Sequence, residues 1–185
     1  MMPISVADRL KKPDLPIHPN QAEQGAYSYW LICLPCHGDR GQGLTDEWRA
    51  VFGPEDQNCW QSKCHAPNHP PQGFEIPRTI PPVLGPSALT RLSTAQDLYR
   101  VIADTMPLWD PDHISDEDAW NLTAYLMRER KVLPARITLN AGNASVFRLH
   151  GVTLTGDDER LAVAIVALLL IVSALAFAFR RPAVR

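Results

Sequence analysis

Two cysteines and a histidine lie close together in the stretch CLPCHG, residues 33–38. Cys33 and Cys36 are separated by two residues, so one helical turn presents both sulfur atoms to the same side. His37 follows directly and adds an imidazole beside the two thiols. This CxxCH spacing is typical of covalent haem attachment, in which the thiols form thioethers with the two vinyl groups of haem and the histidine becomes an axial ligand of the iron.

Two other interpretations of the four cysteines in the chain remain open. Together with Cys59 and Cys64, the first pair would supply the four thiolates of a structural zinc site. Alternatively, Cys33 and Cys36 alone would act as a dithiol redox pair, which commonly follows a strand in a βαβ unit. The zinc interpretation leaves His37 without a role, and no βαβ pattern is visible. Haem attachment is therefore favoured.

The amino-acid composition limits which fold classes could position these residues. The chain has 185 residues, with 17 prolines and 10 glycines, and most of the prolines precede residue 112. This distribution predicts a mainly α domain with short helices and long loops rather than a sheet. The formal net charge is −2, and no cluster of lysines or arginines lies on a predicted helix, so nucleic-acid binding is excluded as a function.

Two helices are predicted in the second half of the domain. The first begins after Ser93, which forms a capping-box pattern with Gln96. Its apolar face consists of Leu98, Val101 and Ile102. The second runs from about residue 116 to residue 130 and has Ser115 as its N-cap. Its inward stripe consists of Trp120, Thr123, Ala124 and Met127.

Around CLPCHG the chain resembles class I c-type cytochromes over about residues 22–132. Gly25 and Tyr29 precede Cys33 at the spacing at which that family has a small residue and an aromatic residue on its N-terminal helix. The small residue permits close approach to the C-terminal helix, and the aromatic ring fills the space beside it. The resemblance implies a class I cytochrome c-like helical domain around haem c.

The resemblance also implies the surroundings of the iron. Met106, followed by Pro107, stands in the loop between two helices where the family has its second axial ligand. A thioether ligand raises the reduction potential relative to a second histidine. Pro81 or Pro82 matches the proline whose carbonyl accepts a hydrogen bond from the far ring nitrogen of the ligand histidine, here His37. That bond holds the ring and raises its basicity.

A second stretch, NCWQSKCHA, has the wider spacing CxxxxCH. Some multihaem cytochromes attach haem through such a spacing, so Cys59, Cys64 and His65 are a possible second haem site. The histidines available as its distal ligand are His69, His113 and His150. We favour a disulfide between Cys59 and Cys64 instead, because the resemblance accounts for one haem and a bridge would stiffen a proline-rich insertion with few apolar residues. Free thiols are the third interpretation.

Residues 161–179 are predicted to form a transmembrane helix. These nineteen residues carry no charge and contain one serine, and a helix of that length just spans a hydrocarbon core of about 30 Å. Arginines follow the segment, so residues 180–185 are predicted to lie in the cytoplasm and the haem domain on the periplasmic or extracytoplasmic side of the cell membrane. The first twenty residues contain no signal-peptide core, so we expect either that the anchor itself translocates the domain or that the natural chain starts earlier.

The predicted organisation has five parts. They are an extended arm (1–21), a cytochrome c domain (22–133) with an insertion (50–80), an extended or hairpin linker (134–160), the transmembrane helix (161–179) and the tail (180–185). Residues 136–152 alternate apolar and polar side chains around Asn140, and we expect this segment to lie against a partner subunit.

We therefore expect an electron-transfer subunit that makes and breaks no substrate bond. Its partners would be other subunits of a respiratory or photosynthetic membrane complex and a redox protein that carries haem or copper. In its overall arrangement, a haem domain with extended arms and a C-terminal anchor, the chain resembles the monohaem cytochrome subunit of an alternative complex III, an assembly that oxidises quinol. A dihaem subunit of a terminal oxidase, a tethered carrier, and a non-redox tail-anchored module with zinc or disulfides are the alternatives.

Overall fold

Residues 6–150 are the part of the chain that the computed structural model describes, and they belong to a unit that ends at Gly151. Among these residues, none of the helices has the length and apolar character needed to cross a membrane. The predicted transmembrane helix (161–179) and cytoplasmic tail (180–185) lie outside the described residues.

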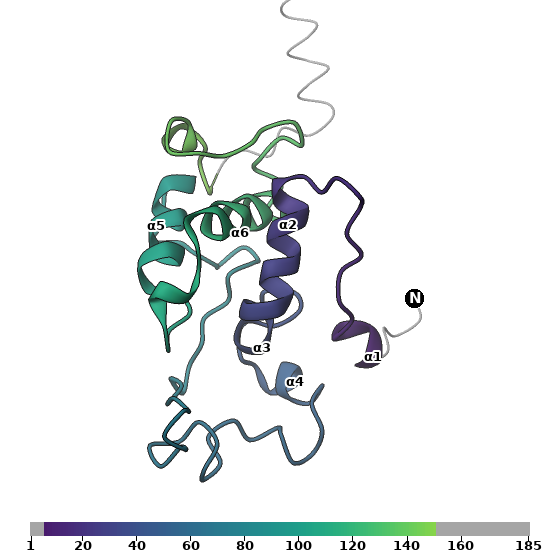
Figure 1. Cartoon of the computed structure of the whole chain (residues 1–185), viewed down its shortest axis with the longest axis vertical. Helices are drawn as coiled ribbons and strands as arrows, with labels where there is room; N and C mark the ends of the chain where they lie inside the picture. Colours follow the sequence, from purple (N-terminus) through teal and green to yellow (C-terminus); the bar gives the residue numbers. More distant parts are fainter. Residues whose placement is uncertain (1–5, 151–185) are drawn as a thin grey trace, which may run out of the picture. The chain divides into compact units, whose positions relative to one another are not determined.

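The described part of the chain is mainly helical, as predicted (Figure 1). Its α-helices are α1 (Val6–Arg9), α2 (Gln21–Ser28), α3 (Leu34–His37), α4 (Asp46–Arg49), α5 (Ala95–Thr105) and α6 (Asp116–Glu129). Shorter elements are the π-helix η1 (Tyr29–Cys33) and the 3₁₀ helices η2 (Pro111–His113) and η3 (Ala144–Val146). Within residues 6–150 there is no strand, and one isolated antiparallel bridge joins Thr94 to Arg148.

Three consecutive helices carry the first cysteine motif. The N-cap of α2 is Asn20, whose side chain accepts from the backbone N–H groups of Ala22 and Glu23. The Glu23 side chain accepts from the Asn20 N–H, which completes a capping box. The chain continues without a break through η1 and α3, which ends at His37. The two thiols and the imidazole are therefore held by one helical run.

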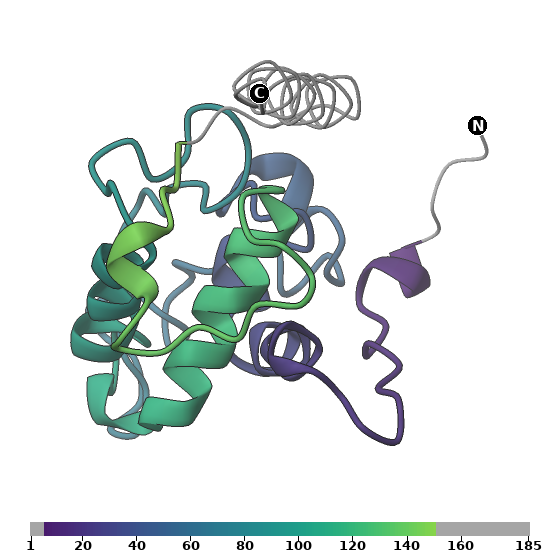
Figure 2. The ribbon, with the colours of Figure 1, turned by 90° about the horizontal axis from the view of Figure 1, so that it is seen from above.

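α2 packs closely against α6, as the resemblance implied. Gly25 is the point of contact, because a Cβ added there would lie 1.9 Å from the backbone oxygen of Asn121 and 2.8 Å from the Cβ of Tyr125. One turn later, the rings of Tyr29 and Tyr125 lie 5.2 Å apart. Figure 2 shows α6 between α2 and α5, and the stripe predicted on α6 is buried.

The caps of the last two long helices are only partly as predicted. Ser115 caps α6 by accepting from the N–H of Asp118, as expected. α5, in contrast, has Thr94 rather than Ser93 as its N-cap, and its capping box uses Asp97 rather than Gln96. The Asp97 carboxylate explains the difference, because it accepts from the N–H of Ser93 and from both the N–H and the hydroxyl of Thr94.

Residues 134–150 were predicted as part of a linker or hairpin, but they lie against their own domain. Leu139, Ala144 and Leu149 are buried in the main core. The Gln21 side chain bonds to both the N–H and the carbonyl of Leu139, and the N–H of Leu149 donates to the carbonyl of Ser93. The segment therefore buries these apolar residues on its own domain, and the expected contact with a partner subunit stays a prediction.

The N-terminal segment also returns to the domain. Arg9 in α1 donates to both carboxylate oxygens of Asp39 at 2.8 and 2.7 Å and to Glu47 at 2.5 Å. Its guanidinium lies 5.3 Å from the ring centroid of Trp48, which is fully buried. The predicted insertion, residues 50–80, consists of turns without a helix or strand.

Candidate functional site

A cavity of about 230 Å³ lies among the helices of the described unit. Apart from its sulfur and ring-nitrogen atoms, its wall is mainly aliphatic and aromatic. η1, α3, α5 and α6 each contribute to it, as do residues 74–83 and 106–109. The apolar face predicted for residues 98–102 points into it, since Leu98, Val101 and Ile102 all line the cavity.

Both cysteines of the first motif line this cavity, together with His37. Burial raises the pKa of Cys33 to about 12 and that of Cys36 to about 11, so both thiols are protonated at neutral pH. Burial also lowers the pKa of His37, and the bond to Pro81 opposes this effect only in part. The imidazole is therefore neutral, which is the form that binds a metal.

The backbone of Pro81 orients the His37 ring. Nδ1 of His37 lies 3.3 Å from the Pro81 carbonyl oxygen, and since a carbonyl only accepts, Nδ1 carries the hydrogen. Nε2 is thus left with its lone pair free. Pro81 lines the cavity but Pro82 does not, so the geometry distinguishes between the two prolines that the sequence left open.

Gly43 explains how the segment that contains Pro81 lies so close to the first motif. Its N–H donates to the His37 carbonyl, and its φ of +80° is a conformation that favours glycine. A Cβ at this position would lie 2.3 Å from the Ile80 carbonyl oxygen. Only glycine allows residues 80–82 to approach this closely.

Met106 lies at the C-terminal end of α5 and lines the same cavity as the two cysteines and His37. The other internal methionine, Met127, is fully buried in the core and does not line the cavity. The structure thus brings together the predicted thiols, imidazole and thioether, and it separates the two methionines as the sequence suggested.

Sequence reasoning missed the aromatic residues of the cavity wall. Phe74 comes from the insertion and stacks on Trp109 at 4.7 Å, and both rings line the cavity. Trp109 follows the Met-Pro pair by two residues, and its side chain remains partly exposed. The sequence did contain a signal for them, because large apolar side chains in otherwise polar, proline-rich loops indicate residues that pack against the domain.

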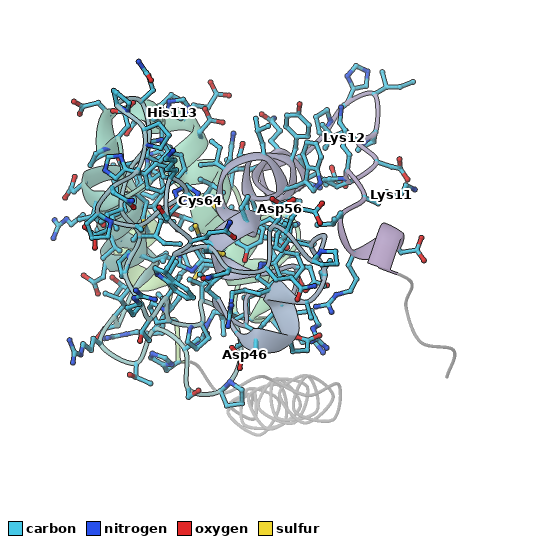
Figure 3. The ribbon with its side chains drawn as sticks, turned by 90° about the horizontal axis from the view of Figure 1, so that it is seen from below. Lys11, Lys12, Asp46, Asp56, Cys64 and His113 are labelled. Atoms are coloured by element: carbon cyan, nitrogen blue, oxygen red, sulfur yellow. The ribbon has the colours of Figure 1, made fainter. Side chains whose placement is uncertain are left out.

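The second cysteine motif lies beside a separate cavity of about 220 Å³. Cys59, Cys64 and His65 all line it, and Figure 3 shows Cys64 near the centre of that view. All four cysteines are free in this structure, so it does not show the disulfide predicted between Cys59 and Cys64. Backbone bonds close this loop without a bridge, since the N–H of His65 donates to the carbonyl of Cys59 at 3.0 Å.

The three histidines predicted as distal ligands do not reach this second cavity. His69 and His150 bond to backbone carbonyls elsewhere, and His113 pairs with Asp110. Within residues 6–150, no three or more His, Cys, Asp or Glu side chains are gathered to hold a metal ion, so the structure gives the zinc alternative no support.

Comparison with protein families adds to this geometry. The family described as "Cytochrome C oxidase, cbb3-type, subunit III" matches residues 20–126, more than half of the chain. The chain belongs to this family. Searches of curated proteins and of solved structures find no match.

As a cbb3-type cytochrome c domain, the chain carries covalently bound haem c and acts as an electron carrier. The residues of the larger cavity fit such a group. Two protonated thiols and a neutral imidazole with a free Nε2 share one wall, and the remaining wall is apolar enough to receive a porphyrin. The matched range begins at Asn20, the N-cap of α2, and ends inside α6, so it includes this whole site.

Proposed function

We propose that the chain is a membrane-anchored cytochrome subunit in which Cys33 and Cys36 hold the haem and His37 and Met106 are its axial ligands. The placement of all four side chains around one cavity carries the proposal. The bound haem supplies an iron that takes up and releases one electron at a time between its ferrous and ferric states.

The protein residues have distinct tasks in this proposal. The Pro81 carbonyl holds the His37 ring through Nδ1, which keeps Nε2 directed to a metal and raises its basicity. The thioether of Met106 favours the ferrous state. Apolar residues such as Leu98 and Ile102 limit access of water, which further disfavours the more highly charged ferric state.

The anchor and the partners belong to the same proposal. Residues 161–179 have the length and apolar character of a membrane span, and the arginines after them favour a cytoplasmic tail. The family description names a subunit of an oxidase, which supports a terminal oxidase as the assembly that receives the electrons. Membership of an alternative complex III stays a prediction.

Peptide mapping of the full-length protein from its native membranes tests haem attachment. Trypsin cleaves after Lys11 and Arg40, which leaves Cys33 and Cys36 on one peptide. We expect this peptide to carry haem that acid-acetone does not extract. An unmodified peptide with two thiols, or one with a disulfide, would contradict the proposal.

A further inference from the structure

The second cavity repeats the arrangement of the first around a different set of residues. Its wall contains the two thiols of Cys59 and Cys64 and the imidazole of His65, and its volume is about 220 Å³; the cavity is smaller and less apolar than the first, and Asp56 and Asn58 also line it. Leu44, Phe52 and Ile76 supply apolar surface. Neither the matched family nor the proposed function assigns a role to these residues.

The orientation of His65 is the observation that points to a ligand. Its Nδ1 lies 3.1 Å from the backbone carbonyl oxygen of Phe74, so Nδ1 carries the hydrogen and Nε2 keeps its lone pair. His37 is held in the same way by Pro81 at 3.3 Å. A backbone carbonyl at the far nitrogen is the usual support of a metal-binding histidine.

The state of the two cysteines agrees with this role. Both are free and both line the cavity, so the thiols needed for attachment are present at its wall. The N–H of Cys64 donates to the Gln61 carbonyl at 2.9 Å, and that of His65 donates to the Cys59 carbonyl at 3.0 Å. These turns bring Cys59 back beside His65 across the five intervening residues.

We propose that Cys59, Cys64 and His65 bind a second haem covalently. In this step each Sγ–H bond breaks and adds across one vinyl group of protohaem: sulfur bonds to the inner vinyl carbon and hydrogen goes to the outer one. No oxidant or reductant is consumed. His65 then ligates the iron through Nε2. Covalent attachment at Cys59 and Cys64 does not depend on the axial role of Met106 at the first site, whereas the carbon monoxide readout described below rests on that proposed ligation.

The surroundings assign this second haem an open coordination position. Apart from His65, no histidine or methionine of the described residues lines the second cavity. We therefore expect a five-coordinate iron that binds carbon monoxide, in contrast to an iron that carries both His37 and Met106.

The two cavities are neighbours, which gives the second haem a role in electron transfer. Cys36 and Ile76 line both of them. The ring of His65 lies 4.4 Å from Phe74, which stacks on Trp109 at the wall of the first cavity. Electrons would thus pass between two sites within one domain.

Trypsin offers a sharp test, because it cleaves after Lys63, between the two cysteines. In the native full-length protein, we expect peptides 50–63 and 64–78 to remain joined after thiol reduction and to carry haem. Peptides that separate on reduction would show a disulfide, and peptides that are separate from the start would show free thiols. Either result overturns the proposal. The haem on the peptide with Cys33 and Cys36 is scored independently, so failure at one site is distinguished from failure at the other.

A variant gives a second readout. Cys59→Ser/Cys64→Ser is expected to reduce the haem content from two per chain to one and to abolish carbon monoxide binding, while the peptide with Cys33 and Cys36 keeps its haem. An unchanged haem content in a folded variant contradicts the proposal. If the variant does not fold, the peptide mapping of the native protein still decides whether Cys59 and Cys64 carry haem.

Discussion

Nδ1 of His37 and the carbonyl oxygen of Pro81 lie 3.3 Å apart, although 44 positions separate the two residues in the chain. The contact depends on Gly43, which adopts positive φ and allows residues 80–82 to approach the first cysteine motif. The orientation of the His37 ring therefore depends on a glycine whose own position lies directly against residues 80–82.

Gly43→Ala is expected to disturb this contact. The new Cβ would lie 2.3 Å from the Ile80 carbonyl oxygen, so residues 80–82 must move away from His37. Loss of the hydrogen bond makes the imidazole less basic, which favours ferrous iron and raises the reduction potential. Potentiometric titration of the haem on Cys33 and Cys36 measures the shift.

Gly85→Ala is the matched control for this experiment. Gly85 also has positive φ, +102°, but a Cβ there meets nothing within 4 Å. Both substitutions carry a backbone strain of about 1–2 kcal/mol, so thermal stability falls in both. Equal potentials in the two variants would show that Gly43 has no influence on the site beyond strain.

Gly25→Ala tests the packing of α2 on α6. The added methyl group would lie 1.9 Å from the backbone oxygen of Asn121, so the two helices must separate. We expect a loss of about 2–3 kcal/mol in the free energy of unfolding, as for other overpacked cores. Gly142→Ala, whose Cβ would meet only the Asn140 side-chain oxygen at 3.1 Å, should be close to neutral in the same thermal or denaturant melt.

The contact between Arg9 and Asp39 predicts a pH dependence. Burial raises the pKa of Asp39, but the bonds from Arg9 and Gln42 outweigh it and hold the pKa below its usual value of 3.8. A lowered folded-state pKa stabilises the protein above the unfolded-state value, and this stabilisation is lost as the pH falls through the folded-state pKa. Arg9→Ala should therefore lower the free energy of unfolding by about 1–2 kcal/mol at neutral pH.

The difference between wild type and Arg9→Ala should shrink as the pH is lowered below about 4, where the Asp39 carboxylate is titrated. Denaturant melts at several pH values measure this trend. Lys11→Ala is the control, because Lys11 and Asp14 form a pair with both side chains exposed, and such pairs contribute about 0–1 kcal/mol. A difference for Arg9→Ala that stays constant down to pH 3 would argue against the Asp39 contact.

Truncation after residue 160 tests the anchor. We expect the full-length chain to stay with the membrane fraction through a carbonate wash and the truncated chain to be released, because residues 161–179 supply the apolar span. The haem spectrum of the truncated chain should be unchanged. Release of both chains would show that these residues do not anchor the protein.

Local patterns in the sequence predicted part of the site. CxxCH and the spacing of Gly25 and Tyr29 depend on residues a turn or two apart, whose relation is determined by helix geometry. The place of Met106 beside them was implied only by the resemblance to class I c-type cytochromes. The cap of α5 shows the limit of such patterns. Ser93 and Thr94 both suit an N-cap, and the choice depends on which acceptor, Gln96 or Asp97, reaches back.

The contacts made by extended segments could not be predicted. Arg9 reaches Asp39 across 30 positions, and Gln21 bonds to Leu139 across 118. Segments such as these have no helical or strand period that would show which residues face the domain. The same reason explains why the burial of Leu139, Ala144 and Leu149 on their own domain was not foreseen.

The most direct test of the proposed electron carrier is the reduction potential of Met106→His in the full-length protein. Replacing the thioether with an imidazole should lower the potential of the haem on Cys33 and Cys36 by on the order of a few tenths of a volt, within the roughly 0.8 V range that axial ligands span. Met127→Leu, a change in the core that leaves the cavity wall intact, should not shift it. An unchanged potential in Met106→His would show that Met106 does not ligate the iron.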